Sequence, residues 1–124
     1  MSDFTPIITP AYQWTSAASA AVTGGQYVEV TGDNTVGPAA AGSQKVVGQA
    51  AHDAAAGASL TVHSPGRIVT EAVAAAIVTA GQPLKTAANG QVTPLVVGTD
   101  NDILRVGIAL AGAAAGALCR HQSA

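Results

Sequence analysis

Residues 46 to 63 read VVGQAAHDAAAGASLTVH, and residues 105 to 121 read RVGIALAGAAAGALCRH. Both stretches contain V-G-x-A followed, after a few residues, by A-A-A-G-A. Gly48 and Gly57 of the first stretch each recur 59 residues later. An internal repeat has to be established before any element is assigned, because each assignment must then suit both copies.

The repeat extends well before these two stretches. Residues 12–26, YQWTSAASAAVTGGQ, align with residues 68–82, IVTEAVAAAIVTAGQ, at an offset of 56 residues. A three-residue insertion in residues 95–102, LVVGTDND, accounts for the change of offset. We therefore predict two tandem repeats, at about residues 12–66 and 68–121, which could form two lobes or one shared barrel.

The repeated segments favour strands over helices. Residues 68–80 alone fit a helical period, but their counterpart, residues 12–24, is rich in Thr and Ser and ends in two glycines, which suits a strand better. Residues 26–31 and 59–63 alternate apolar and polar side chains, and Gly or Pro interrupts the chain roughly every eight to twelve residues. The sequence predicts an all-β protein whose residues 12–124 form a single compact domain resembling a β-barrel or sandwich.

Local signals predict where the strands begin and end. The run ILRVGIAL, residues 103–110, is rich in branched side chains and predicts a strand. The tetrapeptide TGDN at residues 31–34 predicts a turn, and Asn89-Gly90 predicts a two-residue hairpin turn. Each alanine triplet is followed by a glycine, so we expect it to form at most one helical turn between strands.

Residues 1–11, MSDFTPIITPA, have no counterpart in the repeat and contain two prolines, which favour an extended chain. An extended apolar segment can be an arm docked on a partner, or it can be a frayed terminus. The candidate partner contacts are the apolar and aromatic residues of this arm and of the segment that follows it: Phe4, Pro6, Ile7, Ile8, Pro10, Tyr12 and Trp14.

The composition points to a protein that is completed by partners. The 124 residues include 28 alanines but only one Phe, one Trp and two Tyr, so a monomer has a core built from small side chains. Charged residues make up 10% of the chain, the net charge is −2, and the few basic residues are scattered, which argues against nucleic-acid binding. A chain with so few charges tends to associate.

No membrane or export segment is expected. The longest uncharged stretch near the end, residues 106–119, is shorter than the roughly 20 residues of a membrane span and is flanked by Arg105 and Arg120. The first ten residues lack the basic segment and following apolar segment of a secretory signal. We therefore predict no membrane partner.

The sequence also offers little material for catalysis or for holding a metal ion. His52, Asp53, Ser59 and His63 could be imagined as a hydrolase site, but no nucleophile-elbow motif surrounds any serine. The three histidines, together with the single cysteine Cys119, do not fall at a recognised metal-ligand spacing. We predict no catalytic residues, no metal site and no cofactor.

The order of these motifs resembles that of the capsid cement, or decoration, proteins of tailed bacteriophages. The resemblance rests on V-x-x-G-x-x-V, TGDNTVGPA, V-G-x-A before AAAG, the ANGQV hairpin, and V-G-I-A before the second AAAG, and it runs from Tyr12 to His121. It implies a β-rich homotrimer that binds the outside of a phage head at three-fold or local three-fold positions, with the major capsid protein as partner. It also implies synthesis in the host cytoplasm and no active site, and it suits capsid contacts by residues 4–14.

Two other classes of function stay open at this point. A carbohydrate-binding or host-binding module would present aromatic platforms, for which Tyr12, Trp14 and Tyr27 are the candidates. A small hydrolase would require the histidines His52 and His63 to converge with Asp53 in one pocket.

Overall fold

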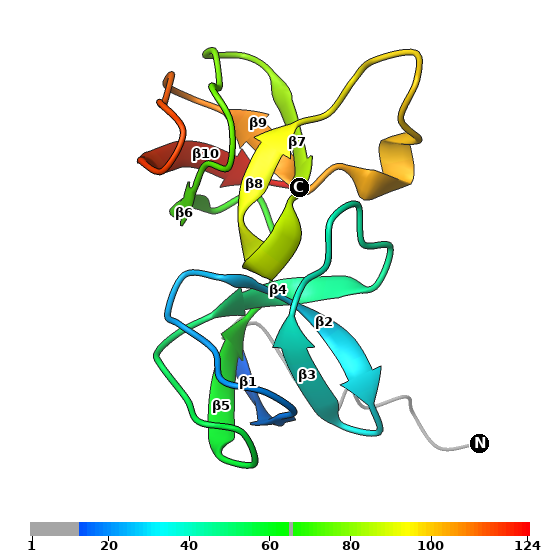
Figure 1. Cartoon of the computed structure of the whole chain (residues 1–124), viewed down its shortest axis with the longest axis vertical. Coiled ribbons are helices and arrows are strands. Elements are labelled where there is room, and N and C mark those ends of the chain that lie inside the picture. The colour runs from blue at the N-terminus through cyan, green and yellow to red at the C-terminus, as the bar shows by residue number, and fades with distance from the viewer. Residues whose placement is uncertain (1–12, 65) are drawn as a thin grey trace, which may run out of the picture.

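The structure is a computed structural model that describes residues 13–64 and 66–124 (Figure 1). Strands dominate it, and the only helical elements in the described residues are two 3₁₀ turns, η1 (Ala88–Gly90) and η2 (Asp102–Leu104). The predicted all-β class is confirmed. No helix in the described part of the chain is long and apolar enough to cross a membrane.

The first repeat forms a closed five-stranded barrel with the strand order β1-β3-β2-β4-β5. Its strands are β1 (Gln13–Ala18), β2 (Tyr27–Gly32), β3 (Thr35–Pro38), β4 (Val46–Ala50) and β5 (Ser59–His63). Antiparallel pairing of β1 with β5 and parallel pairing of β1 with β3 close the barrel.

The second repeat forms a five-stranded sheet with the order β6-β10-β9-β7-β8. Its strands are β6 (Val69–Val73), β7 (Pro83–Thr86), β8 (Val92–Pro94), β9 (Gly107–Ala109) and β10 (Leu118–Ser123). The parallel contact that closes the first barrel is reduced here to a single bridge between Ala74 and Val92. Figure 1 shows the two repeats as separate lobes stacked along the long axis of the molecule.

The strand pairings of the two lobes correspond one for one. Each pairing of β1 to β5 has its counterpart among β6 to β10, including the isolated bridges Val22–Ala54 and Val78–Ala113. These bridges join residues that the two sequence offsets make equivalent. The repeats therefore form two lobes rather than one shared barrel.

The glycine of V-G-x-A is required by a close approach of two strands. A Cβ atom at Gly48 would lie 2.3 Å from the backbone oxygen of His63, and a Cβ at Gly107 would lie 2.6 Å from the backbone oxygen of Gln122. Both distances are too short for any side chain. The same close approach of two paired antiparallel strands thus occurs in each lobe, β4 with β5 and β9 with β10, and explains why this glycine recurs.

The glycine after each alanine triplet serves a different purpose. Gly57 and Gly116 have φ angles of 84° and 85°, a region that side chains with a Cβ atom rarely adopt. The amide of Gly57 donates to the oxygen of Ala18 at 2.7 Å, and that of Gly116 donates to the oxygen of Ala74 at the same distance. The triplets form turns and contain no helix, as expected.

Small side chains fill both cores. The core of the first lobe contains Leu60 together with valines and alanines: Ala18, Val22, Val28, Val36, Ala50 and Val62. The core of the second lobe also includes two residues of the first repeat, Tyr27 and Ala39. Because the second core is completed by the first repeat, we propose that residues 12–124 behave as one domain.

One strand prediction was wrong in its first half. Residues 103–106 lie in or just after η2, and β9 begins only at Gly107. The side chain of Asn101 accepts a hydrogen bond from the amide of Ile103 at 3.1 Å and starts the 3₁₀ turn. The predicted hairpin is present and Asn89 and Gly90 both have positive φ, but the two-residue turn is wrong: Thr86 pairs with Val92, and residues 87–91, which include η1, connect the strands.

Candidate functional site

A buried tyrosine–histidine pair joins the two lobes. Tyr27 on β2 and His121 on β10 are both fully buried, and the Tyr27 hydroxyl lies 2.6 Å from Nε2 of His121. Nδ1 of His121 lies 3.0 Å from the backbone oxygen of Cys119, which can only accept. His121 therefore carries its proton on Nδ1, and its Nε2 accepts a hydrogen bond from Tyr27.

Burial controls the protonation of this pair. Loss of solvation lowers the pKa of His121 below 6.5, although the hydrogen bond to Cys119 opposes this effect. Burial also raises the pKa of the Tyr27 phenol far above its usual value. The neutral imidazole and the neutral phenol are thus the stable forms, and they complete each other's hydrogen bonding.

We expect acid to destabilise the protein through His121. Because the pKa of His121 is lowered in the folded state, the unfolded chain binds the proton more tightly. The free energy of unfolding is therefore unaffected by this group above about pH 6.5 and decreases as the pH drops below that value. The slope contributed by one such group is at most about 1.4 kcal/mol per pH unit. Urea unfolding of the wild type and of His121→Gln, measured between pH 7.5 and pH 5, checks this. Parallel pH profiles for the two proteins would contradict it, since the other histidines are common to both.

A loop of the first lobe, residues 39–45, lies against the second lobe. Thr86 at the end of β7 receives it: the Gly42 amide donates to the backbone oxygen of Thr86 at 2.9 Å, and the Ser43 amide donates to Oγ1 of Thr86 at 3.1 Å. The Thr86 hydroxyl in turn donates to the backbone oxygen of Ala40 at 2.9 Å. The lobes are therefore held together by a polar contact as well as by the shared core.

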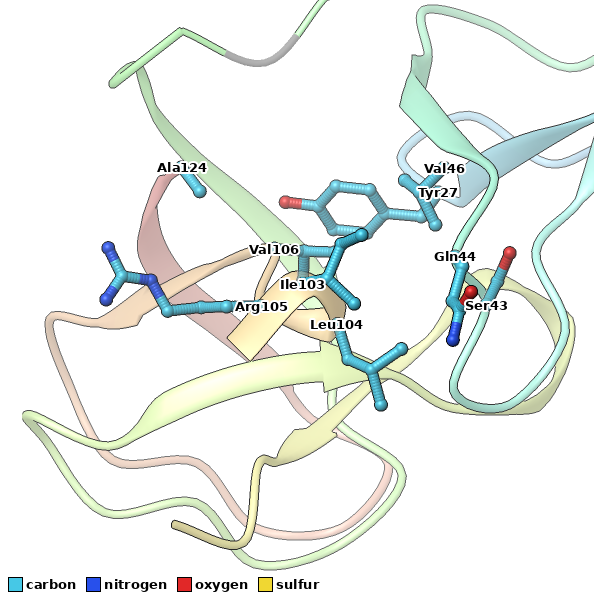
Figure 2. Close-up of a pocket in the computed structure, with 9 residues that line it drawn as sticks. All are labelled: Tyr27, Ser43, Gln44, Val46, Ile103, Leu104, Arg105, Val106 and Ala124. Atoms are coloured by element: carbon cyan, nitrogen blue, oxygen red, sulfur yellow. The ribbon is translucent and has the colours of Figure 1, made fainter. Parts of the chain in front are cut away.

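A crevice of about 100 Å³ opens beside this contact (Figure 2). Tyr27, Ser43 and Val46 line it from the first lobe, and Ile103 and Leu104 belong to its lining from the second. Figure 2 shows the Tyr27 ring lying among these side chains. Sites for small molecules usually have volumes of roughly 300–1,000 Å³, so this crevice is a seam between lobes rather than a ligand pocket.

Of the seven predicted contact residues, the structure describes only Trp14. Its ring lies on β1, half-buried against the first core, and its Nε1–H donates to Oγ of Ser64 at 3.1 Å. The other six lie outside the described residues: Phe4, Pro6, Ile7, Ile8, Pro10 and Tyr12. Tyr27, a candidate aromatic platform, is buried and does not form one.

The candidate hydrolase residues hold loops together. Nδ1 of His52 lies 2.8 Å from the backbone oxygen of Asp53, and its Nε2 accepts a hydrogen bond from the Thr61 amide at 3.2 Å. The carboxylate of Asp53 accepts a hydrogen bond from the Gly24 amide at 2.7 Å. Both polar side chains are thus used to connect the turn at residues 51–53 to its neighbours.

The candidate metal ligands are dispersed. His121 and Cys119 are buried in the second lobe, whereas His52 is exposed on the first. In residues 13–64 and 66–124, no three His, Cys, Asp or Glu side chains come together in a way that could hold a metal ion.

Sequence reasoning missed the uneven distribution of exposed apolar side chains. Eight large apolar side chains are exposed in the described residues, and only Val30 belongs to the first lobe. The other seven lie on the second lobe: Val69, Ile77, Val96, Val97, Ile103, Leu110 and Leu118. The inserted segment LVVGTDND contains two of them, Val96 and Val97. Two adjacent valines directly before a glycine in a predicted loop were the signal that could have indicated exposed apolar side chains.

Solved structures with a similar fold include that of a bacteriophage protein. It is described as the crystal structure of head fiber gp8.5 N base in bacteriophage phi29. The TM-score is 0.68 at 20% sequence identity, and the match covers 90% of this chain and 92% of that chain. At this identity the likeness concerns the fold. No curated protein matches the sequence closely enough to be a relative.

Comparison with protein families agrees with the resemblance seen in the motifs. The model of the family described as phage cement protein matches residues 9–121, which is nearly the whole chain. The match includes both repeats and therefore the glycines, turns and close strand approaches described above. The chain belongs to the phage cement protein family and is a structural protein associated with a phage capsid.

Proposed function

We propose that this protein decorates the outer surface of a tailed-phage head as a homotrimer at three-fold or local three-fold positions. There it binds the major capsid protein and clamps neighbouring capsomers together, after synthesis in the host cytoplasm. The observation that carries the proposal is the family match over residues 9–121. The similar structure, which is described as a phage head fiber base, supports an attachment to the head.

The physical character of the surface supports the same function. A cement protein has to bind many equivalent positions on a lattice, and it can do so with modest contacts because they act together. The exposed apolar side chains of the second lobe supply area for such contacts. The low charge of the chain keeps the desolvation of charged groups at an interface small.

The proposal also includes the absence of catalysis. The side chains of His52 and Asp53 are engaged with backbone groups, and the crevice at Tyr27 is small for a substrate. The variant His52→Ala/His63→Ala is therefore expected to bind heads as the wild type does. Loss of binding by this variant, with its fold preserved by circular dichroism, would count for a role of the histidines in function.

The direct test is binding to heads that lack the decoration. Purified chain is mixed with undecorated expanded heads, the heads are sedimented, and the bound copies are counted by quantitative gel analysis. The proposal predicts saturation at three copies for each occupied three-fold or local three-fold position. It also predicts that decorated heads break down at a higher temperature than undecorated ones. Absence of co-sedimentation at saturating protein would overturn it.

We expect deletion of residues 1–11 to weaken binding to heads while leaving the fold intact. These residues precede β1 and carry five of the predicted contacts. An apolar arm that contacts the shell contributes area that the remaining domain does not replace. Co-sedimentation of the shortened chain, compared with the full chain over a range of concentrations, measures the change. Unaltered binding would remove the arm from the capsid interface.

A further inference from the structure

The two lobes contain equivalent loops at the end of their third strand. Residues 39–45 follow Pro38 in the first lobe, and residues 95–104 follow Pro94 in the second. Both loops start in the same way: the Ala39 amide donates to the oxygen of Tyr27 at 2.9 Å, and the Leu95 amide donates to the oxygen of Pro83 at 2.8 Å.

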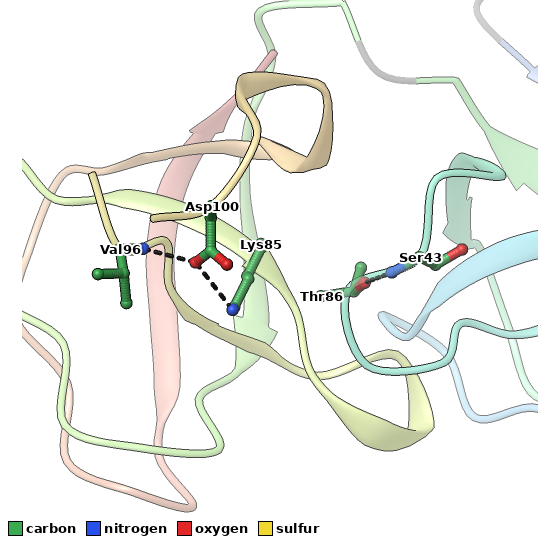
Figure 3. Close-up of polar contacts among 5 residues, drawn as sticks. All are labelled: Ser43, Lys85, Thr86, Val96 and Asp100. Carbon is green, nitrogen blue, oxygen red and sulfur yellow. Dashed lines mark hydrogen bonds and ion pairs between the residues drawn. The ribbon is translucent and has the colours of Figure 1, made fainter. Parts of the chain in front are cut away.

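A carboxylate braces the next amide in both loops. In the first lobe, Glu29 accepts a hydrogen bond from the Ala40 amide at 3.3 Å. In the second lobe, Asp100 accepts one from the equivalent amide of Val96 at 2.7 Å and pairs with Lys85 at 2.9 Å (Figure 3). The hydrogen bond from Lys85 and that from Val96 lower the pKa of Asp100, so the brace persists in mildly acidic solution.

The first loop contacts the second lobe through Ser43, which is buried, whereas Ala40, Ala41, Gln44 and Lys45 are exposed. The loop lies on Thr86, whose side chain is 1% exposed and exchanges hydrogen bonds with the backbone of Ala40 and Ser43.

The second loop is drawn in gold at the upper right of Figure 1. Its last residues, Ile103 and Leu104, line the crevice beside the first lobe, whereas Val96 and Val97 are not part of that lining. Val97 at its tip is 79% exposed, and Val96 and Ile103 are exposed beside it.

The position that would receive the second loop also exists in the chain. Val30, within β2, is equivalent to Thr86 at the end of β7 under the 56-residue offset. Val30 is 41% exposed and is the large apolar side chain that the described first lobe leaves exposed. Within one chain, the loop of lobe one covers the receiving position of lobe two, while Val96 and Val97 of the second loop and Val30 at the first receiving position are exposed.

We propose that the loop at residues 95–104 of one copy docks on Val30 and the adjoining β2–β3 hairpin of a second copy of this chain. The contact continues between copies the interface that already joins the lobes within a copy. The side chains on both sides of the proposed contact differ from those of the internal contact in a matching way, polar within the chain and apolar between copies. Inside the chain, the Thr86 hydroxyl bonds to the backbone of an alanine-rich loop. Between copies, an apolar loop with two valines meets a valine.

The contact between copies is not a duplicate of the internal one. Gly90 in the β7–β8 turn lets the backbone of Tyr27 approach, and a Cβ atom there would lie 2.4 Å from the Tyr27 oxygen. Asn34 stands at the equivalent place in the first lobe and has a side chain. The tip of the β2–β3 hairpin therefore lies further from the partner copy than the β7–β8 turn lies from Tyr27. The proposed contact consists mainly of the valine side chains.

Such a contact joins two different surfaces, so each copy can dock on the next one. A head-to-tail contact forms either an open chain of copies or a closed ring. The inference rests on the proposed homotrimer, in which three contacts of this kind close the ring. It assigns the loop to trimer formation and leaves other surfaces of the second lobe for the capsid.

The test uses single substitutions that place a carboxylate on one side of the contact. Val97→Asp disables the loop and Val30→Asp disables the receiving position. Ile77→Asp is the matched control, because Ile77 is 75% exposed on a different loop of the second lobe. Light scattering on a size-exclusion column is expected to give three times the 12.1 kDa chain mass for wild type and Ile77→Asp, and the mass of one chain for the other two variants.

Mixing the two disabled variants gives the sharper result. Each still has one intact surface, so Val30→Asp is expected to dock its loop on Val97→Asp and form a two-chain complex that grows no further. Circular dichroism and urea unfolding confirm that the variants are folded. Trimers of Val97→Asp, a monomeric wild type, or a mixture that stays monomeric would each overturn the inference.

Head binding separates this inference from the proposed function. If Val97→Asp remains trimeric but no longer binds undecorated heads, the loop contacts the capsid, so the inference fails and the proposed function stands. If the wild type forms trimers by the predicted contact but does not bind heads, the inference stands and the proposed function fails.

Discussion

Gly48→Ala is expected to lower the free energy of unfolding by about 3 kcal/mol or more, which is a large fraction of the roughly 5–15 kcal/mol that folded domains have in total. The new methyl group would lie 2.3 Å from the backbone oxygen of His63 and 2.7 Å from Cγ1 of Val62. A backbone oxygen in a paired strand cannot rotate aside as a side chain can. The paired strands β4 and β5 must therefore move apart to admit the methyl group.

Urea unfolding followed by far-ultraviolet circular dichroism measures this loss. Gly32→Ala is the control, because a Cβ there would meet only Cβ of Thr35 at 3.8 Å. Gly107→Ala should resemble Gly48→Ala, since its methyl group would lie 2.6 Å from the oxygen of Gln122. If Gly48→Ala and Gly32→Ala unfold at the same urea concentration, the close approach of the strands does not explain the repeated V-G-x-A.

Tyr27→Ala is expected to destabilise the protein by about 3–5 kcal/mol, because it removes the largest side chain of the second core. Tyr27 belongs to a strand of the first lobe but packs in the core of the second. Its truncation therefore leaves a cavity in the second core and removes a contact that joins the two lobes. Tyr27→Phe keeps the ring but leaves Nε2 of the buried His121 without its donor. We expect that variant to lose about 1–3 kcal/mol.

The two Tyr27 variants also test the coupling of the lobes. In the wild type we expect one unfolding transition, whereas in Tyr27→Ala the second lobe should unfold at lower urea than the first. Hydrogen exchange resolved by peptide distinguishes the lobes, and Ile77→Ala, which changes an exposed side chain outside the proposed contact between copies, serves as the control. A loss below 1 kcal/mol in Tyr27→Ala would show that the shared core matters little to stability.

Much of the fold could be predicted from the repeat. Alignment of residues 12–24 with 68–80 excluded a helix in both copies, and the structure has β1 and β6 there. The positive φ at Asn89 and Gly90 was also predictable, because this residue pair favours it, although the connection that contains them is longer than two residues. These features depend on neighbours in the sequence, and so they can be read from short motifs.

The prediction failed where the repeats differ. The insertion in residues 95–102 starts η2 and delays β9, so branched residues at 103–106 that suited a strand lie outside one. A propensity for strands is overruled when the side chain of Asn101 offers the chain a local hydrogen bond. The same insertion lengthens the loop that carries Val96 and Val97.

The amino-acid pattern alone establishes that the chain contains one β-unit twice, that glycines recur at matching positions, and that large side chains are scarce. Each of these is a local property repeated at a constant spacing. The folded chain adds what no motif shows: Tyr27 pairs with His121, and Ser43 of one loop is buried against the other lobe while Val97 of the equivalent loop is exposed. The two loops differ in sequence and length, but their environments come from the packing of one lobe on the other, and contacts between residues 94 positions apart leave no periodic trace in the sequence.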